Sequence, residues 1–182
     1  MRASDQWFWQ YNESIERLTV VLSEELVHHV PYKASKLVAM VEGDFPFDCD
    51  DAQQFQHAFD YLESFDQIPP VTVMATALNA AAWLRFGRPQ MPQSWHFQQS
   101  ETNQLPADKK LCELNSGFTK GLFYIVDSDD EFAVCMLLDR EMAVSDIKTL
   151  KQFDTVKVLL NRLQPSTIDP VSDNSYSQQH TA

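Results

Sequence analysis

Two adjacent helical segments constrain the fold of this chain more than any other feature of its sequence. From Asp50 onward, apolar residues recur at spacings of three and four, which places them on one face of an amphipathic helix. The pair Asp50 and Gln53 fits a capping box, and the acidic residues around Asp48 suit the positive end of the helix dipole. The apolar residues of this face are Ala52, Phe55, Ala58, Phe59, Leu62 and Phe65.

The second helical segment starts at Pro69-Pro70 and is apolar on nearly every side. Proline is tolerated at the first position of a helix, where its missing N–H would have no partner. Five alanines within the segment allow close approach by neighbouring elements. Gly87 fits a C-cap and Pro89 prevents continuation, so we expect a buried helix over residues 70–86.

The residues before these helices favour strands. Residues 7–11 and 18–22 are aromatic and β-branched runs on either side of a short polar turn, which predicts a hairpin. Residues 26–30 favour a third strand that ends at Pro31. Residues 35–41 are compatible with one or two helical turns.

The pattern changes beyond Ser94, where short apolar runs replace the helical periodicity. Polar or acidic turns separate these runs, which is typical of an antiparallel meander or a small barrel. Residues 155–163 fit either a strand or a helix by spacing, and the neighbouring runs favour a strand. The runs are residues 95–97, 111–114, 122–126, 132–138 and 142–144.

These patterns predict an α+β protein in which an N-terminal α/β region, with a hairpin and two main helices, joins a C-terminal antiparallel β-barrel-like region. We expect the first domain over residues 1–94 and the second over residues 95–165. Residues 166–182 are polar, and they hold too little apolar area to offset the entropy of ordering the chain. We therefore expect them to form a mobile tail.

The charge balance excludes several classes of partner. Lysine and arginine total 14 against 26 aspartates and glutamates, a formal net charge of −12. Such a field repels phosphate backbones and anionic lipids, and no basic run exceeds two residues, so we expect neither nucleic-acid nor membrane binding. No apolar stretch approaches the roughly 18 residues of a membrane span, and the N-terminus lacks a secretion-signal pattern. We expect a cytoplasmic protein.

The sequence offers little for cofactors or metals. Its four glycines form neither of the glycine-rich motifs that cradle nucleotide phosphates, so we expect no ATP, GTP or NAD site and no cofactor. The cysteines, Cys49, Cys112 and Cys135, form no C-x-x-C pair, which favours three reduced thiols with the last two in the core. The acidic cluster near Cys49 lacks the spacing of a calcium loop, and we expect no metal. His28 and His29 are neighbours in a strand and should point to opposite faces.

One catalytic interpretation stays open as an alternative. Cys49 lies at a predicted helix N-terminus and His57 on the same helix, as a small hydrolase or redox enzyme would need. Three adjacent carboxylates disfavour a thiolate there, which makes helix capping the stronger explanation. We therefore expect no enzymatic activity.

The junction between the two halves is the most distinctive segment. Residues 85–97 hold two arginines, two prolines, a methionine and three aromatic residues in an otherwise acidic protein. One interpretation is a rigid linker whose Trp95 and Phe97 enter the core. The other is a partner-docking surface, because arginine, methionine and tryptophan are enriched at interface hot spots. The candidate partner-binding residues are Arg85, Arg88, Met91, Trp95 and His96.

Several segments, in the right order over nearly the whole chain, resemble the ZapC family of cell division proteins. The most specific is the string Arg-Pro-Gln-Met-Pro-Gln-Ser-Trp-His-Phe at residues 88–97. Arg88 matches a basic position of the family, whereas Gln93 stands where relatives carry lysine. The other matching segments are residues 7–11, 49–52, 77–80 with Arg85, and 156–165.

The resemblance implies a function as well as a fold. The family consists of bacterial cytoplasmic proteins that bind FtsZ, the tubulin-like GTPase of the division ring. It implies a non-enzymatic factor at the division septum that promotes lateral association of FtsZ filaments, stabilises the ring and slows GTP hydrolysis. It also implies an α/β region joined to a barrel-like one. An adaptor for a partner other than FtsZ is a further alternative.

Overall fold

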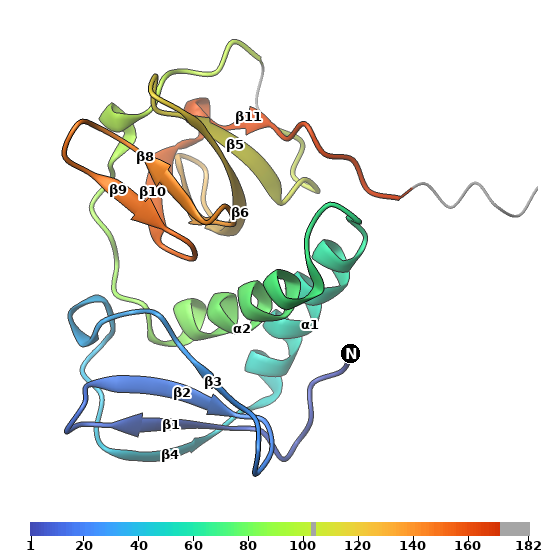
Figure 1. Ribbon diagram of the computed structural model, residues 1–182, viewed down its shortest axis with the longest axis vertical. Coiled ribbons are helices and arrows are strands. Elements are labelled where there is room, and N and C mark those ends of the chain that lie inside the picture. Colours follow the sequence, from blue (N-terminus) through green and yellow to red (C-terminus); the bar gives the residue numbers. More distant parts are fainter. Residues whose placement is uncertain (103–104, 172–182) are drawn as a thin grey trace, which may run out of the picture.

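The computed structural model describes residues 1–102 and 105–171. Two helices lie between a four-stranded sheet and a second, larger group of strands (Figure 1). The predicted α+β class is therefore confirmed. No helix among the described residues is both long and apolar enough to traverse a bilayer.

The N-terminal sheet is antiparallel in the order β3-β2-β1-β4. Its first two strands form the predicted hairpin, in which Trp9 lies opposite Val20, and the predicted third strand follows. The sheet also contains a strand that the sequence did not predict, at Gly43–Pro46. Its two ends are a glycine and a proline, which disfavour strands, and only two residues lie between them, too few for a recognisable apolar–polar alternation. The strands are β1 (Phe8–Asn12), β2 (Arg17–Val21), β3 (Val27–His29) and β4 (Gly43–Pro46). A single short helical turn, η1 (Ala34–Lys36), follows β3.

The first long helix, α1 (Cys49–Glu63), begins one residue earlier than its predicted cap. Asp48 is the N-cap: its Oδ1 accepts the backbone N–H groups of Asp50 and Asp51, each at 3.0 Å. Asp51 returns a bond by accepting the Asp48 N–H at 3.1 Å. The capping box is thus Asp48 with Asp51, and the predicted box of Asp50 with Gln53 is wrong. Asp48 has the extended backbone of an N-cap, with φ −81° and ψ −175°, whereas Asp50 already lies inside the helix.

The second helix, α2 (Pro70–Phe86), has proline at its start as predicted and packs along α1 (Figure 1). It is buried over most of its circumference, so the predicted buried helix is confirmed. It ends at Gly87, which adopts an ordinary φ of −66° rather than a left-handed conformation. Glycine is needed there for space, because a Cβ would lie 2.5 Å from the carbonyl oxygen of Trp83.

The C-terminal strands form a five-stranded antiparallel sheet in the order β10-β7-β6-β5-β11, with a separate two-stranded ribbon of β8 and β9. Among the described residues these sheets do not close into a barrel. The strands of the sheet are β5 (Leu111–Asn115), β6 (Lys120–Ser128), β7 (Phe132–Leu137), β10 (Thr155–Leu159) and β11 (Gln164–Pro165). The ribbon strands are β8 (Glu141–Ala143) and β9 (Thr149–Lys151).

Two predictions for this half need correction. Residues 95–97 do not form a strand: the turn η2 (Ser94–His96) takes their place, closed by a bond from the Phe97 N–H to the Ser94 carbonyl. Residues 155–163 are strand only as far as Leu159, after which the chain turns through η3 (Leu160–Arg162). Three-residue turns carry no periodicity, so spacing cannot distinguish them from strand ends.

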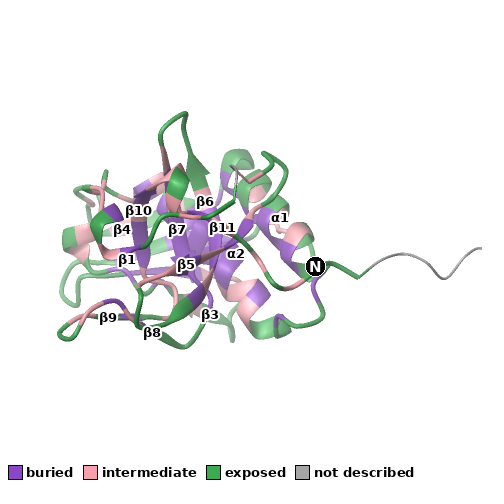
Figure 2. Ribbon diagram, turned by 90° about the horizontal axis from the view of Figure 1, so that it is seen from above, coloured by how far each residue is buried: buried purple, intermediate pink, exposed green. Residues whose placement is uncertain are grey.

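Buried residues concentrate around the helices at the centre of the molecule (Figure 2). One apolar cluster joins the N-terminal sheet and both helices to Leu111, Tyr124, Met136 and Leu138 of the second half. A second cluster, within the C-terminal strands, contains Cys112 and Cys135, which are fully buried as predicted. The helices therefore share one continuous core with the face of the C-terminal sheet.

The first part of the expected mobile tail makes specific contacts. The N–H and Oγ1 of Thr167 donate to Glu113 Oε1 at 3.0 and 2.7 Å, and the Val171 N–H donates to the Ser64 carbonyl at 2.8 Å. Ile168 packs against the larger apolar cluster. Residues 172–182 lie outside the described residues, so the expectation of a tail is left open there.

Candidate functional site

Arg85, the first of the two junction arginines, is engaged inside the fold. Its guanidinium donates to a carboxylate oxygen of Asp51 and to the Pro46 carbonyl, the latter at 2.9 Å, and lies 3.3 Å from Asp48 Oδ2. Trp9 Nε1 donates to the same Asp51 oxygen at 2.8 Å. This arginine therefore ties the end of α2 to β4 and to the first turn of α1.

Asp51 is the centre of this network, and its side chain is only 4% exposed. Burial raises the pKa of its carboxyl group, while the bonds from Trp9, the Asp48 N–H and Arg85 act in the opposite direction. A buried carboxylate of this kind needs all its donors, because a charge left without partners is costly. The network thus stabilises the N-terminal half by joining both helices to the sheet.

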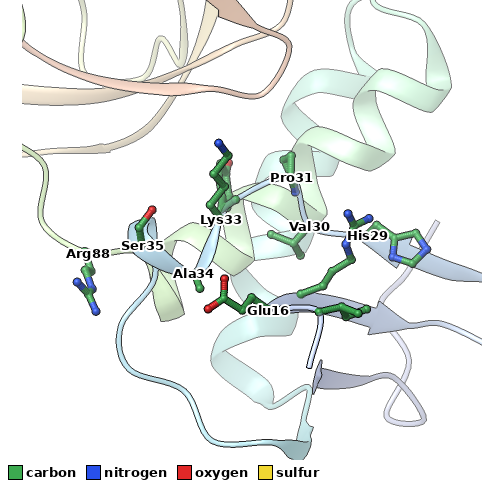
Figure 3. A pocket seen from close by; sticks show the side chains of 11 residues that line it. Glu16, His29, Val30, Pro31, Lys33, Ala34, Ser35 and Arg88 are labelled. Carbon is green, nitrogen blue, oxygen red and sulfur yellow. The ribbon is translucent and has the colours of Figure 1, made fainter. Parts of the chain in front are cut away.

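Arg88, the second junction arginine, is exposed and lines a recess of about 630 Å³ (Figure 3). The recess lies between the β1–β2 turn and the segment that follows β3. Three further basic side chains line it, Arg17, His29 and Lys33, and one carboxylate, Glu16. We call these four basic residues and the space they surround the cationic recess.

The cations of this recess have no carboxylate partners in the part of the chain that the structure describes. The ion pairs found there involve Lys36, Arg85 and Lys151. Arg17, Lys33 and Arg88 are all exposed, so their charges are open to an incoming group. On a chain of net charge −12, the recess is a local reversal of sign that can pair with carboxylates.

The rest of the junction divides between surface and core. Met91 and Trp95 are 80% and 72% exposed, whereas Phe97 is 4% exposed. The linker interpretation is therefore right for Phe97 and wrong for Trp95. His96 is half-buried beside Trp95, and burial, with the nearby Lys148 charge, lowers its pKa.

Lys148 contacts the junction directly, since its Nζ donates to the amide oxygen of Gln93. Burial and the charge of Lys36 lower the pKa of the Lys148 amine. The sequence offered no sign that a lysine from the β8–β9 turn would lie beside Gln93. The Lys148 amine thus brings a positive charge next to Gln93, the junction position at which this chain has an amide instead of a lysine.

The two adjacent histidines have different surroundings, as their alternation in a strand predicts. His28 is half-buried, and its Nε2 lies 2.8 Å from Asn79 Oδ1 on α2. Burial lowers the pKa of His28, an effect larger than that of the Asn79 hydrogen bond. His29 is exposed and belongs to the cationic recess.

The catalytic alternative gains no support from the geometry. Cys49 is exposed at the first residue of α1, and His57 is exposed on the same helix eight residues later. A rise of about 1.5 Å per residue separates them by about 12 Å along the axis, too far for a proton to pass between them. Within residues 1–102 and 105–171, no group of three or more potential ligands could hold a metal.

Sequence reasoning found one residue of the cationic recess, Arg88, and missed Arg17, His29 and Lys33 as its neighbours. These residues lie far from Arg88 in the chain, and nothing in their local pattern marks them. They meet because the end of α2 returns to the β3–η1 segment, where the Arg88 N–H donates to the Lys36 carbonyl at 2.9 Å.

Comparison with known proteins places the chain in a family. The family model described as "Cell-division protein ZapC, N-terminal" matches residues 1–88, and the model described as "Cell-division protein ZapC, C-terminal" matches residues 89–169. The chain is 48% identical over 171 residues to "Cell division protein ZapC" of Idiomarina loihiensis, which covers 93% of this chain and 92% of the relative.

Other relatives carry the same name. The proteins of Shewanella frigidimarina and Aeromonas hydrophila are 35% and 30% identical over 167 and 178 residues. These matches cover 87% and 98% of this chain, and 90% and 98% of the relatives. The chain belongs to the ZapC family of cell division proteins.

Proposed function

We propose that this protein binds FtsZ directly, promotes bundling of FtsZ filaments in the division ring and reduces their GTPase activity. It acts in the cytoplasm at the division septum and catalyses no reaction of its own. Family membership supports the role in cell division. The single observation that supports direct protein binding is the cationic recess, whose cations have no carboxylate partners among the described residues.

The junction, whose first part contributes Arg88 to the recess, suits a protein partner. This chain has a net charge of −12, so its overall field does not attract carboxylates and a contact with them has to be local. Arg88 supplies charge from the recess, while Met91 and Trp95 supply exposed apolar area on the same junction. Arginine and tryptophan in such a setting are the residue types that dominate binding energy at protein interfaces.

Bundling requires more than one contact. A micromolar contact corresponds to about 8 kcal/mol, and the repeated sites of a filament multiply its effect. A molecule with two sites, or a dimer with one site each, would join neighbouring filaments. Filaments held side by side would also exchange subunits more slowly, which accounts for a lower rate of GTP hydrolysis.

The experiment is cosedimentation of the protein with purified FtsZ and GTP. We expect the wild type to pellet with FtsZ, and the double variant Lys33→Glu and Arg88→Glu to lose at least tenfold in affinity. The double variant Lys109→Glu and Lys120→Glu is the matched control, because it makes the same change of charge at two exposed lysines that do not line the cationic recess. Arg85 is left intact, since reversing its charge would break the Asp51 network.

Two results would contradict the proposal. If the wild type stays in the supernatant with polymerised FtsZ, direct binding is excluded, and an adaptor for another partner becomes the better explanation. If the double variant folds and pellets like the wild type, the recess is not the contact. Light scattering and phosphate release in the same samples measure bundling and GTP hydrolysis.

A further inference from the structure

Strand β3 forms one edge of the N-terminal sheet, and two of its three residues direct their backbone polar groups away from the sheet. The Val30 N–H donates to the Leu18 carbonyl at 3.0 Å, which fixes the phase of the ladder with β2. Residues of an antiparallel pair alternate between bonded and non-bonded positions. His28 therefore bonds inward to β2, while Val27 and His29 direct their N–H and C=O groups outward.

This edge is open to a partner. Within the part of the chain that the structure describes, the outward groups of Val27 and His29 accept and donate no hydrogen bond. Val27 is 40% exposed and His29 is exposed. The opposite edge is partly blocked by contrast, since Pro46 of β4 has no N–H and its carbonyl accepts the Arg85 guanidinium.

The open edge leads directly into the cationic recess. His29 belongs to both, and Lys33 follows it on the same segment, with Arg88 on another side of the recess (Figure 3). Arg17 also lines the recess. Backbone groups along an edge select an extended chain, and surrounding cations select carboxylates. We propose that the β3 edge and the recess bind an extended, acidic polypeptide segment, which adds a fifth strand to the N-terminal sheet.

The charges along the edge also orient the segment. Glu24 and Glu25 lie in the turn before β3, so the edge runs from acidic at its start to basic at Lys33. The carboxylates of the bound segment therefore gather at the His29 end. This inference rests on the proposed function, because it treats the recess as a binding site for a partner. It concerns how the partner binds, and it holds for any partner with an extended acidic segment.

Amide hydrogen exchange of the full chain tests the strand addition without any substitution. The probe is the peptide acetyl-Thr-Glu-Val-Glu-Val-Glu-Thr-amide, and a peptide with lysine in place of glutamate is the control. We expect the acidic peptide to slow exchange of the Val27 and His29 amides at least tenfold and the basic peptide to leave them unchanged. Absence of binding at millimolar peptide, or binding without protection of these two amides, overturns the proposal.

A pair of variants separates the backbone from the side chain. His29→Pro removes an outward N–H and no bond of the ladder, whereas His29→Ala keeps the N–H and removes the imidazole. We expect peptide affinity to fall at least tenfold for His29→Pro and less than threefold for His29→Ala, while equal affinities would overturn the strand addition. The peptide assay contains no FtsZ. If the peptide does not bind but the protein still pellets with FtsZ, only the strand addition is rejected. If the peptide binds but the protein does not pellet with FtsZ, only FtsZ as the partner is rejected.

Discussion

The guanidinium of Arg85, at the end of α2, contacts the buried carboxylate of Asp51 in the first turn of α1. The same carboxylate accepts the Trp9 indole N–H, so one side chain links two helices and β1, an inner strand of the sheet. Arg85 and Arg88 are three residues apart in the chain but have different surroundings. The first stabilises the fold, and the second is exposed and lines the cationic recess.

Arg85→Ala should therefore lower the free energy of unfolding by about 2–3 kcal/mol, because it leaves Asp51 buried with fewer donors. The estimate is below that of a fully buried pair, since the Arg85 side chain is 27% exposed. Urea unfolding measures the change. Lys151→Ala, which breaks the exposed pair with Glu141, is the control and should cost under about 1 kcal/mol. Equal losses for the two variants would contradict the structural role of Arg85.

Gly87→Ala should destabilise the protein although the backbone angles permit alanine. The added Cβ would lie 2.5 Å from the Trp83 carbonyl and 2.7 Å from its ring, so the end of α2 would have to shift. Such overpacking costs about 1–3 kcal/mol. Thermal unfolding measures it, and an unchanged or raised Tm would show that the helix end adapts without cost.

His28 should make stability depend on pH. Burial lowers its pKa below 6.5 in the folded state, so the unfolded chain binds a proton first as pH falls. Stability is then fully present above pH 6.5 and declines below it. His28→Gln should flatten this slope, measured by urea unfolding at pH values between 5 and 7.5. His57→Gln, on the exposed side of α1, is the control, and an identical slope in both variants would reject the assignment to His28.

Trp95 and Phe97 should respond oppositely to truncation. Trp95→Ala should change stability by less than about 0.5 kcal/mol, because the side chain is 72% exposed, yet weaken cosedimentation with FtsZ. Phe97→Ala should cost about 3–5 kcal/mol, because the ring is buried in the C-terminal cluster against Phe123. Urea unfolding followed by circular dichroism gives both values. A large loss of stability for Trp95→Ala would mean that the side chain packs inside the fold.

Elements with sustained periodicity were predictable from the sequence. The two helices and the first hairpin bury a continuous apolar face, so the pattern of Phe55, Leu62 and the alanines of α2 specifies both the element and its buried side. Short elements were not predictable. The strand at Gly43–Pro46 and the turn at Ser94–His96 hold three or four residues each, and their partners come from elsewhere in the chain.

The sequence by itself determined the acidic character, the buried helices and the family motif of the junction, because each depends on residues close together in the chain. The tertiary structure alone decided which basic side chains have a carboxylate partner among the described residues. Arg85 pairs with the carboxylate of Asp51, which is 34 residues away in the chain. Arg88 lines the same recess as Arg17, His29 and Lys33, and no local sequence pattern predicts that these residues lie close together. Electrostatic interactions depend on distance in space, and spacing along the chain fixes that distance only within a single helix or strand.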